Sequence, residues 1–466
     1  MKKLLILVFL TLNGLSGYSQ VFDFSNVNLL GRWFEPTMPA EPQFAAKYNS
    51  CYGYVDPNNN KEYAIIGSSK GTHIIDVSNP GNPVEVDYVA GRRDNCVWRE
   101  YKTYQHYLYA VSDDAPPNSL QIIDLAYLPD SVHVIHDADT IFQKSHTIYI
   151  DGNKLYCGIL TTLSTQYAMG VYSLNDPENP QFLADLNSFF PQFSQVHDMF
   201  VRNDTVYASC GFDKLQIFKF DSINNSFSQI GSLNTYPEAG YNHSSTLTND
   251  GEYLIFADEV PAELGMKIVN VSDPGDIQLS SVFRSNQGAT PHNPYLLGNK
   301  AIIAYYRDGL QIFDVSNPAN PVRTGFFDTH PQNGVSYTGQ PYQGAWGAYP
   351  FFPSGNILVS DMQLGLFVLD ANVALGNPTV TEKSNEWRIT LQPNPSEGNC
   401  VLMGLKAQKW EVKILDIHGR IVLRQSGTEL QGNTLNLNIE TLDQGIYQVR
   451  VEYQDGSFSG ENLVKR

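Results

Sequence analysis

The chain has 466 residues, a formal net charge of −18, 12% aromatic residues and 17% charged residues. The negative charge argues against binding to nucleic acid or to anionic membrane surfaces, because both repel an acidic protein. The many aromatic residues and the lack of long helical periodicity are typical of an all-β protein. The length suits a large repeat domain followed by an additional module.

The N-terminus has the pattern of a secretory signal peptide. A basic start precedes an apolar run from Leu4 to Leu12, and the small residues Gly17 and Ser19 fit a cleavage site directly after Ser19. The apolar run is too short to span a membrane. We therefore expect that residues 1–19 are removed, that the protein is exported, and that no membrane span remains after signal removal.

One strand-like phrase recurs along the chain. Its clearest copies run from Gly71 to Pro80 and from Gly309 to Pro318, where β-forming residues end at an Asn-Pro turn. Seven copies at a spacing of roughly 50 residues indicate the seven blades of a propeller. The aspartate position of the phrase is occupied in the successive copies by Asp76, Asp124, Ser173, Lys219, Asn270, Asp314 and Asp370. We expect these aspartates to accept hydrogen bonds from the following turn, which is a structural role.

The third copy shows the complete unit. Four short strands lie between His146 and Leu186, and the tight turn Asp151-Gly152-Asn153 joins the first two. Four antiparallel strands make one blade. The last blade lacks a fourth strand, and Val27 to Phe34 resembles the fourth strand of the blade before it. We infer that this N-terminal strand completes the last blade and closes the ring.

The repeated phrase resembles the LVIVD repeat of secreted bacterial propellers. The Leu29-Leu30-Gly31 opening and the overall layout resemble the choice-of-anchor B proteins of that group. The resemblance covers about residues 25–370 and implies a seven-bladed β-propeller there. The third and fourth blades depart from the pattern, because Ser173 and Lys219 replace the aspartate.

A separate module follows the repeats. Residues 371–386 form a predicted linker, and short alternating strands in residues 387–466 indicate a small Ig-like β-sandwich. This segment has Pro-Asn-Pro-x-x-Gly at 393–398, Asp-x-x-Gly-Arg at 416–420, Gly-Ile-Tyr at 445–447 and a basic end. Together these motifs resemble the type A C-terminal sorting domain of the type IX secretion system. The resemblance implies recognition by the type IX machinery, removal of the domain, and a final location at the outer-membrane surface or outside the cell.

Polar side chains recur where the first strand of each blade enters the central channel. Matching the strand starts predicts one layer that consists of Cys51, Cys96, His146, His197, His243, His292 and Trp346. The second strand ends at the same rim and adds Asp113, Asp258, Arg307 and Asp361, with Asp114, Asp198, Glu259 and Asp308 close by in sequence. We therefore predict a ligand-binding mouth at this rim.

The chemistry of this mouth allows two interpretations. Imidazoles and carboxylates are ligands for zinc, iron or manganese, so His146, His197, His243 and His292 are candidate metal ligands. Alternatively, these side chains bond to backbone carbonyls and channel water, as buried polar groups must. The sequence leaves open whether a divalent metal is a cofactor. Cys51 and Cys96 occupy matched positions on adjacent blades, so they form a disulfide if their Cα atoms approach within about 7 Å, and are otherwise reduced thiols.

The sequence favours a binding protein over an enzyme. It contains no nucleophile elbow, no phosphate-binding loop and no zincin helix. We predict a secreted, surface-delivered binding or interaction module that acts as a monomer on an unidentified extracellular ligand. The alternative is an exported metal-dependent hydrolase or lyase that uses the His/Asp-lined mouth.

Overall fold

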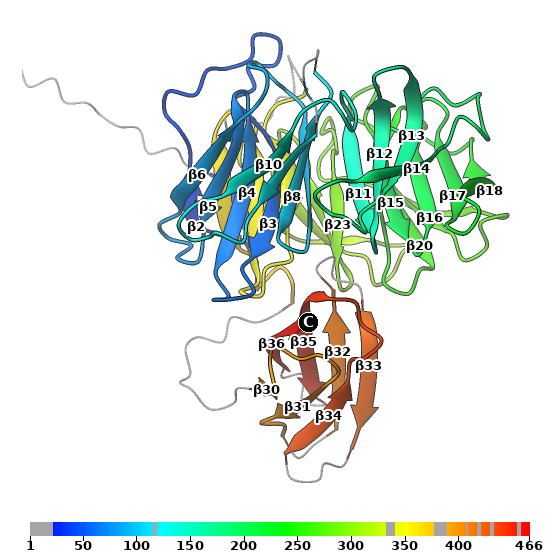
Figure 1. The fold of residues 1–466 in the computed structure, drawn as a ribbon. Coiled ribbons are helices and arrows are strands. Elements are labelled where there is room, and N and C mark those ends of the chain that lie inside the picture. The colour runs from blue at the N-terminus through cyan, green and yellow to red at the C-terminus, as the bar shows by residue number, and fades with distance from the viewer. Residues whose placement is uncertain are drawn as a thin grey trace, which may run out of the picture.

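The computed structural model describes residues 22–114, 118, 120–331, 341–376, 389–406, 409–416, 421–428, 433–453 and 458–466. All of its regular elements are strands, which form seven sheets in the repeat region and two sheets after it (Figure 1). The predicted signal peptide and residues 377–386 of the predicted linker lie outside the described residues. The protein is therefore all-β, with a seven-bladed β-propeller and a smaller C-terminal β domain.

The first four blades follow one another along the chain. The first blade consists of β3 (Tyr48–Val55), β4 (Glu62–Ser68), β5 (Gly71–Asp76) and β6 (Val84–Ala90). The second consists of β7 (Arg99–Tyr104), β8 (Tyr107–Ser112), β9 (Gln121–Asp124) and β10 (His133–Asp137). The third consists of β11 (Thr147–Asp151), β12 (Lys154–Thr161), β13 (Gln166–Ser173) and β14 (Gln181–Asp185). The fourth consists of β15 (Asp198–Arg202), β16 (Thr205–Ser209), β17 (Leu215–Asp221) and β18 (Ser226–Leu233).

The last three blades include the N-terminal strands. The fifth blade consists of β19 (Asn242–Leu247), β20 (Tyr253–Asp258), β21 (Met266–Asn270) and β22 (Gln278–Phe283). The sixth has β23 (Pro294–Leu297), β24 (Lys300–Ala304), β25 (Leu310–Asp314), β26 (Val322–Phe327) and the short β1 (Phe24–Ser25). The seventh consists of β27 (Ala345–Tyr349), β28 (Asn356–Asp361), β29 (Gly365–Asp370) and β2 (Asn28–Trp33).

Strand β2 closes the ring. It pairs antiparallel with β29 from Asn28 opposite Asp370 to Trp33 opposite Leu366. This confirms the inference that the N-terminal strand supplies the missing fourth strand of the last blade. The pairing of β1 with β26 on the sixth blade was not predicted, because β1 contains only the two residues Phe24 and Ser25.

The recurring aspartate position has a structural role, as predicted. In six of the seven blades its side chain accepts a hydrogen bond from the backbone N–H two residues later, in the turn that ends the third strand. The acceptors are Asp76, Asp124, Ser173, Asn270, Asp314 and Asp370. These short polar side chains therefore stop the strand by capping the turn that follows. Lys219 has no such acceptor, and Asp221 caps the next turn of that blade instead.

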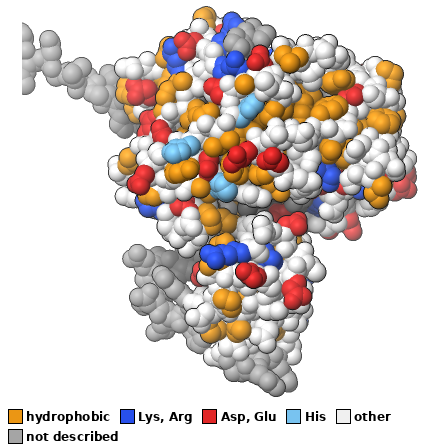
Figure 2. Space-filling model, in the orientation of Figure 1, with side chains coloured by type: hydrophobic (Ala, Val, Ile, Leu, Met, Phe, Trp, Pro, Cys, Tyr) orange, Lys and Arg blue, Asp and Glu red, His pale blue; other side chains and the backbone are white. Residues whose placement is uncertain are grey.

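Buried apolar and aromatic residues fill the space between neighbouring blades. One such cluster joins the third, fourth and fifth blades around Val171, Phe218 and Phe256, which are 0% exposed. The outer wall is different, because acidic, basic and histidine side chains are interspersed with apolar ones on the face that Figure 2 shows. The core of the propeller thus lies between its sheets, as expected for packed blades.

The C-terminal domain has two sheets. One contains β30 (Thr390–Gln392), β31 (Asn399–Met403) and β34 (Thr434–Asn438), and the other β33 (Ile421–Gly427), β32 (Trp410–Leu415), β35 (Gly445–Tyr453) and β36 (Phe458–Lys465). Their buried residues, among them Val412, Leu437 and Val449, form one separate core. Cys400 is 2% exposed within that core, so it serves there as a small apolar residue. Across the described part of the whole chain, no helix is long and apolar enough to cross a membrane.

Ring closure yields a prediction about Gly31 in β2. A Cβ atom at Gly31 would lie 2.1 Å from the backbone oxygen of Pro80 in the first blade, so Gly31→Ala must push β2 away from its neighbour. We expect a loss of about 1–3 kcal/mol in the free energy of unfolding, measured by chemical denaturation.

Gly81→Ala is the matched control, because the nearest atom to its new Cβ would be 3.8 Å away. Its effect should stay within about 0.5 kcal/mol. Equal stabilities of the two variants would contradict the close packing of β2 against the first blade.

Candidate ligand-binding channel

The first strands of neighbouring blades contact one another around the central axis, and their side chains line a channel. Four histidines predicted for one layer do lie together there. The ring centroids are 4.2 Å apart for His146 and His197, 4.4 Å for His197 and His243, and 4.5 Å for His243 and His292. Trp346 continues the series, 4.7 Å from His292. We call the four histidines the histidine arc.

Backbone carbonyls orient two rings of the arc. Nδ1 of His197 donates to the carbonyl oxygen of His243 at 3.2 Å, and Nδ1 of His292 donates to the carbonyl of Trp346. Because a carbonyl can only accept, the proton of each neutral ring lies on Nδ1. The Nε2 atom of each ring therefore keeps its lone pair.

The layer was predicted to continue through Cys51 and Cys96 in the first two blades. That prediction is wrong. Ser50 donates to Glu100 at 2.9 Å, and Thr147 donates to Asp198 at 3.1 Å, so these four residues share the layer that follows the histidines. Asn49 precedes Ser50, and Arg99 precedes Glu100. These two residues therefore occupy, in the first two blades, the position that the histidines occupy in the others.

Of the two alternatives for Cys51 and Cys96, the structure therefore shows free thiols and not a disulfide. Cys51 lies two residues beyond its assumed position and Cys96 three residues before it, partly because an irregularity between Tyr48 and Cys51 interrupts the register of β3. Cys96 instead contacts the backbone oxygen of Arg93 at 3.4 Å. All five cysteines are free and buried.

Two carboxylates contact the arc. Asp113 lies 2.8 Å from Nδ1 of His146, as the prediction of a shared rim implied. Glu259 lies 3.6 Å from Nε2 of His243, and its other oxygen accepts a 2.6 Å hydrogen bond from the hydroxyl of Tyr306. The sequence analysis placed Glu259 only near the rim and selected its neighbour Asp258 instead.

Asp258 and Asp361 have structural partners instead. The Asp258 carboxylate lies 2.7 Å from Nζ of Lys267, and both side chains are 0% exposed. The Asp361 carboxylate accepts a hydrogen bond from Thr329 at 2.7 Å and others from the following turn. Neither residue lines the mouth, because adjacent residues of a strand point to opposite faces.

Arg307 is also absent from the lining of the mouth. It lies in the turn after β24 and, after burial, its charge is the second factor that lowers the pKa of His330 to about 4. The mouth encloses about 420 Å³ of space, open solvent included, and is lined by Trp98, Glu100, His146, Thr147, His197, Asp198, His243, Glu259, His292, Asn293, Tyr306 and Trp346.

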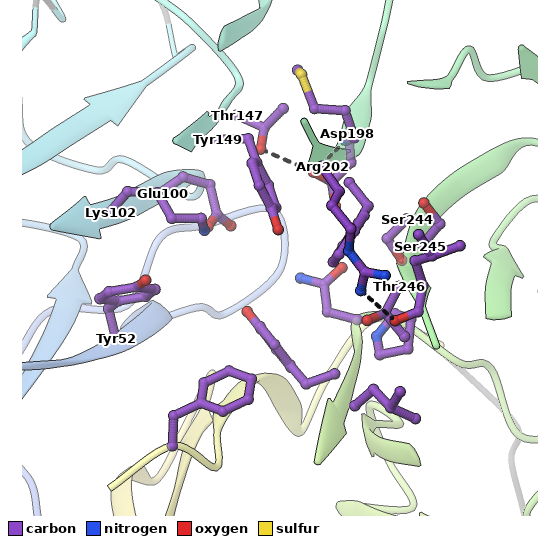
Figure 3. A pocket seen from close by; sticks show the side chains of 18 of the residues that line it. Tyr52, Glu100, Lys102, Thr147, Tyr149, Asp198, Arg202, Ser244, Ser245 and Thr246 are labelled. Atoms are coloured by element: carbon purple, nitrogen blue, oxygen red, sulfur yellow. Dashed lines mark hydrogen bonds between the residues drawn. The ribbon is translucent and has the colours of Figure 1, made fainter. Parts of the chain in front are cut away.

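A larger cavity continues the channel beyond this mouth. It encloses about 770 Å³, open solvent included, and Glu100, Thr147, Asp198 and Asn293 line both spaces. In Figure 3 the labelled Tyr52 and Tyr149 rings, the Glu100 and Lys102 side chains, and Arg202 point into one open space. Aromatic faces and charged groups thus converge inside the ring.

The cavity is lined by ionisable side chains that are costly to bury in their charged form. Burial raises the pKa of the Glu100 and Asp198 carboxyl groups above their ordinary values, and the Lys102 ammonium opposes the shift. The Lys102 ammonium also lies 5.1 Å from the centroid of the Tyr52 ring, and Arg202 donates to the carbonyl of Thr248 at 2.9 Å. Buried carboxylates destabilise a fold, so carboxyl groups with shifted pKa values in a cavity indicate a candidate ligand-binding site.

The sequence analysis missed Glu100, Lys102 and Arg202. Their signal is the period of two along each first strand, which places residues two apart on the same face. Counting from Glu100 to Lys102, and from Asp198 through Phe200 to Arg202, would have found them.

The geometry of the arc predicts an uneven histidine titration. Burial opposes the charged form of His146, but Asp113 more than offsets it and raises the pKa of His146 above its ordinary value. Burial lowers the pKa of His197 well below that value, and the pKa values of His243 and His292 to about 3. We expect NMR of the ring protons to show His146 protonating first as the pH falls, with the other three far later.

The same shifts fix a pH dependence of stability. The folded pKa values of His197, His243 and His292 lie below the unfolded value of about 6.5, so the unfolded state binds more protons once the pH falls below about 6.5. The free energy of unfolding therefore decreases as the pH falls below about 6.5, because protons bind preferentially to the unfolded state. Asp113→Asn should lower the pKa of His146, because it removes the carboxylate that favours the charged ring. Four independent histidine titrations near pH 6.5 in the unaltered protein would contradict the burial and contacts described for the histidine arc.

Comparison with known proteins assigns parts of the chain. A model described as LVIVD repeat matches residues 61–90 and 295–329, which fall in the first and sixth blades. A model described as secretion system C-terminal sorting domain matches residues 390–465. No curated protein matches the chain.

One similar solved structure is the crystal structure of the computationally designed Ika8 protein, with 8% identity and a TM-score of 0.44 over 69% of this chain and 82% of that one. The family matches agree with the two resemblances found in the sequence. The chain therefore carries LVIVD repeats in a seven-bladed β-propeller and ends in a secretion system C-terminal sorting domain, which directs its export to the outer-membrane surface or the extracellular space.

Proposed function

We propose that the propeller is a binding module at the cell surface and that its central channel holds a small polar ligand. The observation that carries the proposal is the convergence of Glu100, Lys102 and Asp198 with aromatic rings in one solvent-connected cavity. A core that served stability alone would contain apolar side chains at these positions, because buried carboxylates destabilise the folded state.

The lining indicates the class of ligand. Tyr52, Tyr149 and Tyr295 offer flat apolar faces, while Glu100 and Asp198 offer strong hydrogen-bond acceptors. A molecule with hydroxyl or amino groups around an apolar ring face satisfies both requirements. Sugars and amino sugars have this chemistry, so we propose a saccharide as the ligand.

The alternative function, a metal-dependent hydrolase or lyase, requires a metal ion at the mouth. His243, Glu259 and His292 are the residues that would hold that ion. The binding role does not depend on such an ion, since the larger cavity has its own polar and aromatic lining.

A ligand screen tests the binding role. Calorimetry with soluble mono- and oligosaccharides, amino sugars included, should find a ligand whose affinity falls at least about tenfold in Asp198→Asn and Glu100→Gln, because each change removes a charged acceptor. Both variants should fold normally, since they replace carboxylates that are costly to bury.

Asp94→Asn is the control, because Asp94 pairs with Lys70 on the surface and is 62% exposed. It should bind as the unaltered protein does. The proposal fails if no saccharide binds, or if Asp198→Asn and Glu100→Gln bind with unchanged affinity.

Removal of the sorting domain tests delivery. A chain that ends at Asn385 should fold its propeller and stay in the periplasm, because the matched domain at residues 390–465 is gone. Protease treatment of intact cells would measure surface exposure. The reciprocal control fuses residues 387–466 to an unrelated periplasmic reporter, which should then reach the cell surface. Surface exposure of the truncated chain would show that the export signal lies outside these residues.

A further inference from the structure

We propose that His243, Glu259 and His292 bind one divalent transition-metal ion at the mouth of the channel. One ligand atom from each residue lies within 4.8 Å of the other two, and the three come from two neighbouring blades. His243 lies in β19, at the register irregularity between Asn242 and Ser244, Glu259 directly follows β20, and His292 precedes β23. The channel mouth therefore brings together residues that are remote in sequence.

The tautomer of His292 suits metal binding. Its Nδ1 donates to the carbonyl of Trp346, so the lone pair on Nε2 is available to an ion. Metal-bound histidines usually make this kind of second hydrogen bond to a backbone carbonyl or a carboxylate, which fixes the ring orientation. The ring of His292 is 2% exposed, so this orientation is held by packing as well.

Glu259 is oriented in the same way. The Tyr306 hydroxyl donates to one carboxylate oxygen at 2.6 Å, and the other oxygen lies 3.6 Å from Nε2 of His243. Tyr306 thereby leaves one oxygen of Glu259 directed at the histidine ring. Hydrogen bonding of a ligating carboxylate is the usual support around a metal site.

His243 lacks an adequate partner of its own. It is 5% exposed, and its Nδ1 faces the backbone of His292 without forming a hydrogen bond of normal geometry. A buried polar atom without a good partner destabilises the fold. Coordination of a metal ion through Nε2, on the side of Glu259, would give this buried ring a strong partner.

The donor set selects the class of ion. Two imidazole nitrogens and one carboxylate oxygen suit zinc, iron(II), cobalt(II) or manganese(II), whereas calcium and magnesium prefer oxygen ligands alone. Three protein ligands leave at least one position of the ion open to the channel. The ion could thus contact a molecule that enters the mouth.

The inference goes beyond the proposed saccharide-binding role and is tested separately from it. Metal uptake is measured with no other ligand present, so its failure leaves the binding role of the larger cavity untouched. Conversely, the Glu100 and Asp198 variants, which should weaken saccharide binding, keep all three metal ligands.

The experiment is a metal titration of the full chain, purified without a polyhistidine tag and stripped with a chelator. Calorimetry with zinc, and the visible absorption of cobalt(II), should show one bound ion per chain. His243→Ala, His292→Ala and Glu259→Gln should each weaken binding by at least about tenfold, and Tyr306→Phe by about 10-fold to 100-fold, because it acts through Glu259.

His133→Ala is the control, because His133 is an exposed histidine on the outer strand β10, stacked 3.6 Å from the ring of Tyr127. It should bind metal as the unaltered chain does. No uptake, or equal affinity in the three ligand variants and the unaltered chain, would overturn the proposal.

A second readout needs no variant and covers the case in which a substitution impairs folding. Cobalt(II) added to the unaltered protein should shift and broaden the ring signals of His243 and His292 before those of His133. Simultaneous broadening of all histidine signals would show surface binding only and would also overturn the proposal.

Discussion

The pairing of β2 with β29 is the constraint on which the rest of the structure depends. It joins Asn28 to Asp370, so the two ends of the repeat region meet in one sheet. Without it the seventh blade would keep three strands and an open edge, which is a hazard for any β protein. Closure also fixes how the first strands face the axis, and the channel is the direct consequence.

The side chains that line the channel come from equivalent strand positions in successive blades, but their surroundings differ from blade to blade. Each blade contributes one residue per layer, so the histidine arc and the layer with Glu100 and Asp198 follow from one strand geometry repeated around the propeller. Differences between blades then create the chemistry. Asp113 raises the pKa of His146, whereas burial lowers those of His243 and His292. One end of the histidine arc therefore binds a proton more readily than the other.

Much of this architecture was predictable because its signals are local and repeated. The Asp314 phrase predicted the third strands, Val27 to Phe34 predicted the closing strand, and the four histidines were placed together. The register of the first blade was not predictable, because the irregularity before Cys51 interrupts the pairing of β3 at a place that no motif marks. The choice of Asp258 over Glu259 shows the same limit, since an error of one residue in a strand reverses its face. The Lys267 partner of Asp258 lies on a different strand, and only the folded sheet brings them together.

Native-state hydrogen exchange tests the central role of ring closure most directly. If β2 holds the propeller together, the backbone amides that pair β2 with β29 should exchange as slowly as those that pair β28 with β29, through unfolding of the whole propeller. Rapid exchange of the β2 amides, with the other strands of the seventh blade still protected, would contradict the account. It would mean that the channel keeps its geometry without the N-terminal strand.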